Sequence, residues 1–166
     1  AVETLEAAER HFENADRPNK KNEVVTTLWH KGRIRIKSGN PTGIDDIGKH
    51  LDGIKGTNMD NWHWRANDHC LLGIAYWDIL ADRSAAAATF ESMVKDYKPD
   101  DVAVNFAAQA YGVDNALANL ISAWERVSGD PSISHTRLAS DLALLMRHVE
   151  RLRQAELSMI QSLGLV

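Results

Sequence analysis

The chain has 166 residues, of which 44% are hydrophobic and 25% charged, and its formal net charge is −4. This composition is typical of a globular protein and excludes a disordered one. The acidic balance argues against a general nucleic-acid binder, and no apolar run approaches the roughly 18 residues that span a membrane. We therefore expect a soluble protein that forms one domain over residues 1–166 and that partners neither nucleic acid nor membranes.

Helical periodicity recurs along nearly the whole chain. The apolar spacing and the turn residues predict helices over about residues 2–15, 22–32, 44–54, 60–80, 84–97, 102–127 and 134–162. We expect Asp60 or Asn61 to cap the fourth helix and Thr42 with Asp45 to form a capping box before the third. Gly112 and Asp114 favour a break in the sixth.

One short stretch departs from helical spacing. Residues 33–37 alternate apolar and basic side chains, which is a strand signature, but no other segment alternates so cleanly. Continuation of the preceding helix is favoured, and a short extended piece stays open. The basic residues around this stretch predict a solvated face, and they are Lys31, Arg33, Arg35 and Lys37.

These elements predict an all-α protein with about six or seven helices. The arrangement is either a multi-helix bundle or a short array of helical hairpins. Cys70 is the only cysteine, which excludes an internal disulfide, and its place on an apolar stripe predicts a buried, inert thiol. The composition is compatible with a cytoplasmic or an exported protein, and the cytoplasm is slightly favoured.

A loose internal period of about 34–35 residues runs through the middle of the chain. Leu72, Gly73 and Tyr76 are followed by Ala86 and Phe90, and then by Pro99. The second unit has Ala110, Tyr111, Trp124 and Pro131 at similar spacing but lacks the Leu-Gly pair. Over about residues 70–131 the chain resembles tetratricopeptide-type helical repeats. The resemblance implies paired helices that approach closely at small residues, and a scaffold whose concave face binds a peptide or a helix.

The segment of residues 60–70, below called the 60–70 segment, has the most unusual composition. It carries two Trp, two His, two Asp, one Arg and one Cys at the start of a predicted helix. Apolar pockets with a few polar groups are the usual ligand sites. The candidate ligand-binding residues are Trp62, His63, Trp64, Arg65, Asp68 and His69. The competing interpretation is that the tryptophans anchor the core while the polar residues cap the helix and face water.

No catalytic or cofactor motif is present in the sequence. The chain lacks a His-Glu-x-x-His zinc motif, a Glu-x-x-His pair, a Gly-x-Ser-x-Gly elbow and a Cys-x-x-Cys-His haem site. We therefore expect no cofactor and no metal. A metal at His63 and Cys70 would need further ligands from distant segments.

The sequence thus favours a non-enzymatic helical interaction module that recognises a peptide or protein partner. The alternative is a small helical enzyme, or a small-molecule or metal binder, with a pocket around residues 60–70. Homo-oligomerisation through the alanine-rich face of residues 85–88 is a further possibility, because small residues permit close helix approach.

Overall fold

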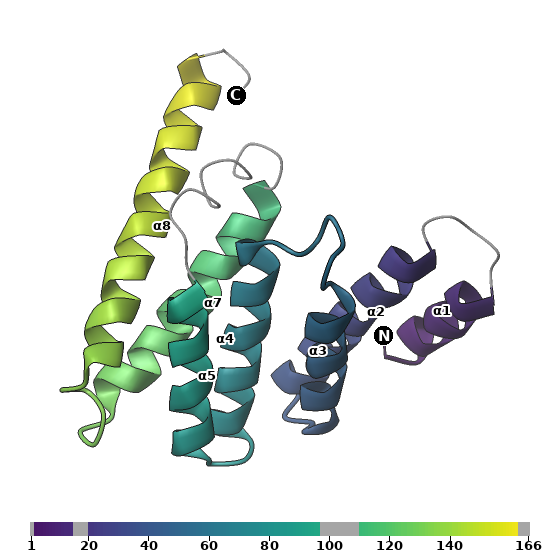
Figure 1. The fold of residues 1–166 in the computed structure, drawn as a ribbon, viewed down its shortest axis with the longest axis horizontal. Coiled ribbons are helices and arrows are strands. Elements are labelled where there is room, and N and C mark those ends of the chain that lie inside the picture. The colour runs from purple at the N-terminus through teal and green to yellow at the C-terminus, as the bar shows by residue number, and fades with distance from the viewer. Residues whose placement is uncertain (1, 15–19, 97–109, 163–166) are drawn as a thin grey trace.

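The computed structural model describes residues 2–14, 20–96 and 110–162, and every regular element in these ranges is an α-helix (Figure 1). The predicted all-α, multi-helix architecture is therefore confirmed. The helices, with their bounds, are α1 (Val2–Asn14), α2 (Lys20–Lys37), α3 (Thr42–Gly53), α4 (Trp62–Asp78), α5 (Arg83–Asp96), α7 (Ala110–Gly129) and α8 (Arg137–Ser162).

At two positions where the sequence left room for a break, the structure shows an uninterrupted helix. Residues 33–37 continue α2 as helix, so the alternating pattern does not produce a strand. The break expected at Gly112 and Asp114 was wrong, because α7 runs through both positions. One glycine costs a helix only about 1 kcal/mol, which the packing of a 20-residue helix outweighs. The part of the expected sixth helix over residues 102–109 lies outside the described residues, as does Tyr97.

Of the two helix caps that the sequence predicted, the one at α3 is absent and the one at α4 is present. The capping box of Thr42 and Asp45 was wrong, because no side chain caps α3. Instead Asn40 Oδ1 accepts hydrogen bonds from the Thr42 backbone N at 3.0 Å and its Oγ1 at 2.8 Å, which orders the turn. The Asn61 cap of α4 is confirmed, since its side-chain oxygen accepts from Trp64 N at 3.3 Å.

Neighbouring helices pair along the chain into hairpins that lie side by side (Figure 1). The pairs are α2 with α3, α4 with α5, and α7 with α8, while α1 packs on α2. Helix α4 lies in the middle and contacts α2, α3, α5 and α7. One hydrophobic cluster joins α2, α3 and α4, a second joins α4, α5, α7 and α8, and Tyr76 packs against both.

Glycines let two of these hairpins close tightly. A Cβ at Gly73 would lie 2.2 Å from Phe90 Cε1, so the Phe90 ring of α5 fills the space that a side chain on α4 would need. In the α2–α3 hairpin, a Cβ at Gly43 would lie 2.7 Å from the Gly32 carbonyl oxygen. At Gly43 the two backbones approach one another, and at Gly73 a ring packs directly on the α4 backbone, which larger residues would prevent.

An ion-pair cluster ties α1, α2 and α3 together, and it corrects the expectation of a solvated basic face. Lys31 Nζ lies 3.3 Å from the Asp46 carboxylate and Arg35 Nη1 lies 2.6 Å from it, and Lys31 and Asp46 are both buried. Arg35 also pairs with Glu6 of α1. These cations turn inward because Asp46 is buried beside them and needs compensating charge.

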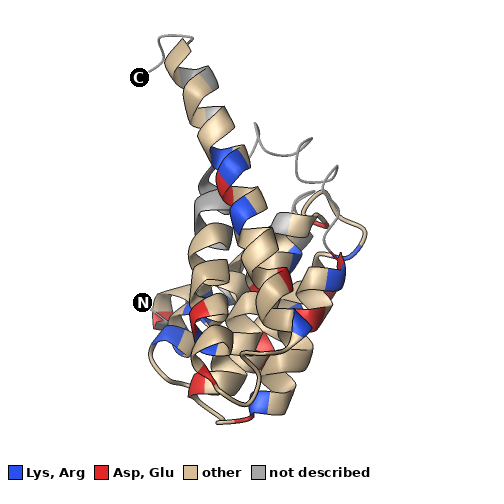
Figure 2. Ribbon diagram, turned by 90° about the vertical axis from the view of Figure 1, so that its left-hand side faces the viewer, with Lys and Arg blue, Asp and Glu red and all other residues tan. Residues whose placement is uncertain are grey.

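Lys and Arg are interspersed with Asp and Glu along the described helices (Figure 2). Within the described ranges, none of the helices combines the length and apolarity that crossing a membrane requires. In both ribbon views the C-terminal turns of α8 extend beyond the other described helices (Figures 1 and 2).

We predict that Gly73→Ala destabilises the protein by about 1–3 kcal/mol, because the added methyl group overlaps the Phe90 ring in a filled core. Chemical denaturation with urea measures this change. Gly48→Ala is the matched control, since nothing lies within 4 Å of its Cβ position in α3. That substitution should stabilise by about 0.5–1 kcal/mol through lower chain entropy. Equal effects of the two substitutions would contradict the close α4–α5 approach.

Candidate functional site

The tryptophans of the 60–70 segment point into two different cores. Trp62, at the first position of α4, is fully buried in the cluster shared with α5, α7 and α8. Trp64 is half-buried against the α2–α3 side, where its ring lies edge-on to Trp29 with centroids 5.4 Å apart. Two residues apart on a helix, the side chains point in different directions. The pair therefore anchors α4 to both neighbours and does not floor a common pocket.

Asp68 and His50 form a fully buried pair between α4 and α3. His50 Nδ1 and Asp68 Oδ2 are 2.7 Å apart, and both side chains have no exposed surface. The Trp64 ring packs on the imidazole, with centroids 5.4 Å apart. Neither His50 Nε2 nor Asp68 Oδ1 has a hydrogen-bond partner. The pair links the first two hairpins through a single strong contact in a low-dielectric setting.

Burial shifts the pKa of Asp68 in this pair. Desolvation raises the pKa of Asp68 to about 6, and the hydrogen bond and charge of His50 oppose that rise. Nearby on α2, desolvation lowers the pKa of His30, with smaller contributions from the charges of Arg33 and His50. An aspartate that orients a histidine is a common arrangement for general-base catalysis. Here both groups are shut off from solvent, so the pair has no route to a substrate.

Arg65 and His69 face the opposite side of α4, towards the end of α5. Arg65 Nη1 lies 2.6 Å from Asp60, and its Nε lies 3.9 Å from Asp96. His69 Nε2 lies 3.8 Å from the same Asp96. Desolvation lowers the pKa of His69, while Asp96 opposes that shift. These contacts form a network around Asp60 and Asp96 that joins the start of α4 to the end of α5.

The predicted site residues of the 60–70 segment are neighbours in the sequence, but in the structure they do not line one cavity. Trp62, Trp64 and Asp68 are directed to three buried contacts, and Arg65 and His69 to a surface network. The side chain of His63 lies outside the described residues. Over the ranges that the structure describes, no group of three or more His, Cys, Asp or Glu side chains is arranged to hold a metal ion.

Cys70 is buried, as the sequence predicts. Its Sγ lies 3.2 Å from Met93 Sδ of α5, and burial raises the pKa of the thiol. A thiol held protonated in an apolar core is a poor nucleophile and a poor metal ligand. Cys70 therefore contributes packing between α4 and α5.

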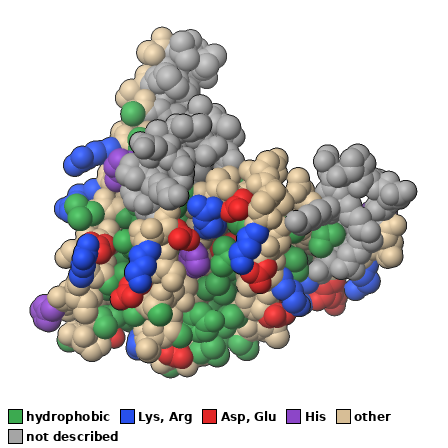
Figure 3. All heavy atoms as spheres, in the orientation of Figure 1, with side chains coloured by type: hydrophobic (Ala, Val, Ile, Leu, Met, Phe, Trp, Pro, Cys, Tyr) green, Lys and Arg blue, Asp and Glu red, His purple; other side chains and the backbone are tan. Residues whose placement is uncertain are grey.

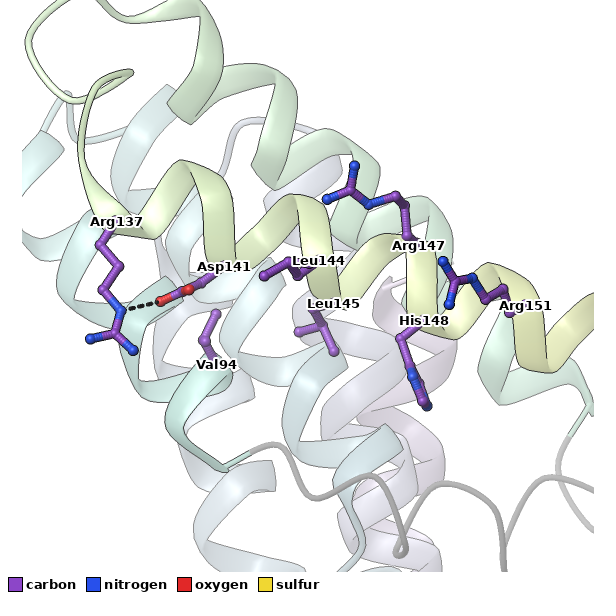
Figure 4. Close-up of a pocket in the computed structure, with 8 residues that line it drawn as sticks. All are labelled: Val94, Arg137, Asp141, Leu144, Leu145, Arg147, His148 and Arg151. Atoms are coloured by element: carbon purple, nitrogen blue, oxygen red, sulfur yellow. Dashed lines mark ion pairs between the residues drawn. The ribbon is translucent and has the colours of Figure 1, made fainter.

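Surface grooves run along α8, and the sequence did not predict them. The α7–α8 groove, with a volume of about 540 Å³, is lined by Leu117, Ile121, Trp124, Met146, Arg147, Glu150 and Arg151. The α5–α8 groove is lined by Val94, Arg137, Asp141, Leu144, Leu145, Arg147, His148 and Arg151 (Figure 4). Arg147 and Arg151 border both grooves.

The side chains of the α5–α8 groove are spread along α8. Figure 4 shows Arg137 at the start of the helix, and Arg147 and His148 pointing to different sides several turns later. Arg137 is already engaged, because its Nε lies 3.3 Å from Asp141 one turn away. The fourteen positions from Arg137 to Arg151 correspond to about 21 Å of helix. An elongated surface of this kind suits a polypeptide segment better than a compact small molecule.

Exposed apolar and basic side chains gather on the same part of α8. Leu144 is 59% exposed and Ile121, on α7, is 38% exposed. Arg147 and Arg151 are exposed, and neither forms an ion pair within the described residues. The space-filling view shows basic side chains beside hydrophobic ones over α8, at the left of the molecule (Figure 3). This combination distinguishes the α8 surface from the 60–70 segment, where charges are paired.

The sequence carried only an indirect signal for these grooves. Ile121 follows the buried Leu120, and Leu144 precedes the buried Leu145, so each places a second apolar residue beside the core stripe. Such a broadened stripe indicates apolar surface on more than one face of a helix. It does not identify which other helix forms the opposite wall.

No protein-family model matches the chain, and neither a curated protein nor a solved structure shows significant similarity to it. The likeness to tetratricopeptide-type repeats therefore rests on the residues quoted above.

We predict that Asp68→Asn changes how stability depends on pH. Because the folded protein raises the pKa of Asp68 from 3.8 to about 6, it holds a proton that the unfolded chain releases between these values. The stability that Asp68 contributes is therefore fully present below about pH 4 and is lost as pH rises towards 6. Urea denaturation measures the unfolding free energy of the wild type and of Asp68→Asn at each pH. The wild-type value minus the variant value should fall over this interval and then stay constant.

Asp45→Asn controls for the loss of one carboxylate, because Asp45 is exposed on α3. A wild type that gains stability relative to Asp68→Asn as pH rises from 4 to 6 would contradict the assigned direction. That outcome would mean that the hydrogen bond and charge of His50 outweigh the desolvation of Asp68.

Proposed function

We propose that the chain is a non-enzymatic helical interaction module that recognises a peptide or protein segment through the grooves along α8. The observation that carries this proposal is the α8 surface itself. It combines exposed apolar residues, the exposed Arg147 and Arg151, and a span of about 21 Å from Arg137 to Arg151. Contiguous apolar surface bordered by polar residues is typical of sites that bind other proteins.

The hairpin arrangement supports the same function. Paired helices in a row, with a glycine-to-aromatic contact in one pair, agree with the resemblance to tetratricopeptide-type repeats. Proteins built from stacked helix pairs present long, rigid surfaces to partners. The resemblance alone would place a bound peptide on the concave face of the helix row. The side chains that line the grooves favour α8 as the binding surface instead.

The alternative of an enzyme or ligand pocket around residues 60–70 has one observation in its favour. His50 Nε2 and Asp68 Oδ1 are buried polar atoms without hydrogen-bond partners, which is unusual and occurs at functional sites. Against it, both residues are fully buried, and the candidate side chains diverge from one another. We therefore favour a structural role for the pair, in joining α3 to α4.

Self-association through the alanines of residues 85–88 stays a prediction. Ala86 is fully buried and Ala87 packs against the core of α4, α7 and α8. Only Ala88 of this set is exposed. Much of the alanine face is thus already used within the chain, which leaves a narrow strip for a second copy.

The test is a selection from a random library of displayed peptides about 16 residues long, enough to cover four helical turns. We predict that a recovered peptide binds saturably in fluorescence anisotropy. Ile121→Gln or Leu144→Gln should weaken its binding about tenfold, because each removes apolar contact area in a groove. Both residues are exposed, so the fold should be retained.

Leu80→Gln is the matched control, because Leu80 is 49% exposed just after α4 and lines neither groove. The recovered peptide should bind this variant with the same affinity as it binds the wild type. A selection that yields no saturable binder would count against the interaction module. Binders that are insensitive to both groove variants would remove α8 as the binding surface.

A further inference from the structure

We propose that the α7–α8 groove takes an amphipathic helix that carries acidic residues beside its apolar face. This inference rests on the proposed function and specifies the chemistry of the partner. Three features of the groove lead to it, namely its apolar floor, its length and the charge along its rim. Each feature involves described side chains of α7 and α8.

The floor of the groove is apolar and is built on two rigid elements. Leu117 and Trp124 of α7 and Met146 of α8 are partly or fully buried, and each packs in or against the core. Ile121 lies between the two α7 residues and is 38% exposed. Aromatic and Met side chains at a partly exposed groove are characteristic of protein recognition surfaces.

The length of the floor matches a helix better than an extended strand. Leu117 and Trp124 are seven positions apart, which corresponds to about 10 Å, or two helical turns. A partner helix presents apolar anchors over the same distance at positions i, i+3 or i+4, and i+7. Two packed helices also form a furrow that accepts the ridge of a third helix. An extended peptide that binds by strand addition would require an open sheet edge, and the described ranges contain only helices.

The rim supplies the charge preference. Arg147 and Arg151 are one helical turn apart, are exposed and form no ion pair within the described residues. Glu150, between them, is already engaged by Arg153 at 3.8 Å and by Gln154 at 2.8 Å. Two guanidinium groups at this spacing suit carboxylates one turn apart on a partner helix, where charge-assisted pairs form.

Other occupants fit the groove less well. A second copy related by a two-fold axis would bring the same patch against itself, so that the arginines of the two copies, Arg147 and Arg151, would lie near one another and repel. Nucleic acid would meet the apolar floor and a chain whose net charge is −4. An acidic amphipathic helix satisfies both the floor and the rim.

The experiment uses two synthetic peptides of identical length and helical apolar stripe. One carries glutamates at the positions that flank the stripe, and its twin carries lysines there. Binding of each peptide to the full chain is measured by fluorescence anisotropy at low and at high ionic strength. The double variant Arg147→Glu/Arg151→Glu is measured in parallel. Arg10→Glu/Lys55→Glu is its control, because it makes the same charge change at exposed sites far from the groove.

The glutamate peptide should bind the wild type about tenfold more tightly than the lysine peptide, with a preference that diminishes at high salt. Arg147→Glu/Arg151→Glu should reverse the preference, and the control should preserve it. Ile121→Gln should weaken both complexes about tenfold, because the apolar floor is common to them.

A preference for the lysine peptide, or one that survives the arginine reversal, would overturn the inference. Failure of both peptides to bind, while library-selected peptides bind and respond to Leu144→Gln, would also overturn it and would leave the proposed function standing. Absence of binding by the synthetic and the selected peptides together would reject both.

Discussion

The close approach of α4 and α5 at Gly73 is the constraint on which the rest of the molecule depends. The Phe90 ring occupies the space where a Gly73 side chain would lie, so these helices form a tight hairpin at the centre. Helix α4 then presents its other faces to α2 and α3 on one side and to α7 on the other. The α7–α8 pair contributes buried residues such as Leu120 and Leu142 to the same core. Apolar residues of these two helices, among them Ile121 and Met146, line the α7–α8 groove.

Buried polar pairs influence how α1, α2, α3 and α4 join. Asp46 is held by Lys31 and Arg35, and Asp68 by His50, so each acidic group lies where two helices meet. Such pairs add little net stability, because desolvation offsets their attraction. They are costly to separate, however, since a lone buried charge has no compensation. We interpret them as contacts that fix one relative placement of α1, α2, α3 and α4, and hence the geometry of the whole row.

The sequence predicted the features that depend on near neighbours along the chain. Helical periodicity located the helices, Asn61 was recognised as a cap, and Cys70 was assigned to the core from its stripe. Features that need a distant partner were not predictable. The inward turn of Lys31 depends on Asp46, and the burial of Asp68 depends on His50 of another helix. The grooves escaped detection for the same reason, since their walls come from α5, α7 and α8.

The most direct test of the account is amide chemical-shift mapping of the isotopically labelled chain during titration with a peptide that binds it. We expect the perturbed amides to cluster on α7 and α8, around residues 117–124 and 144–151. The amides of the 60–70 segment and of His50 should stay unperturbed. Perturbations centred on His50, Trp64 and Asp68, with α8 unaffected, would contradict the assignment of the binding surface and would return the function to the 60–70 segment.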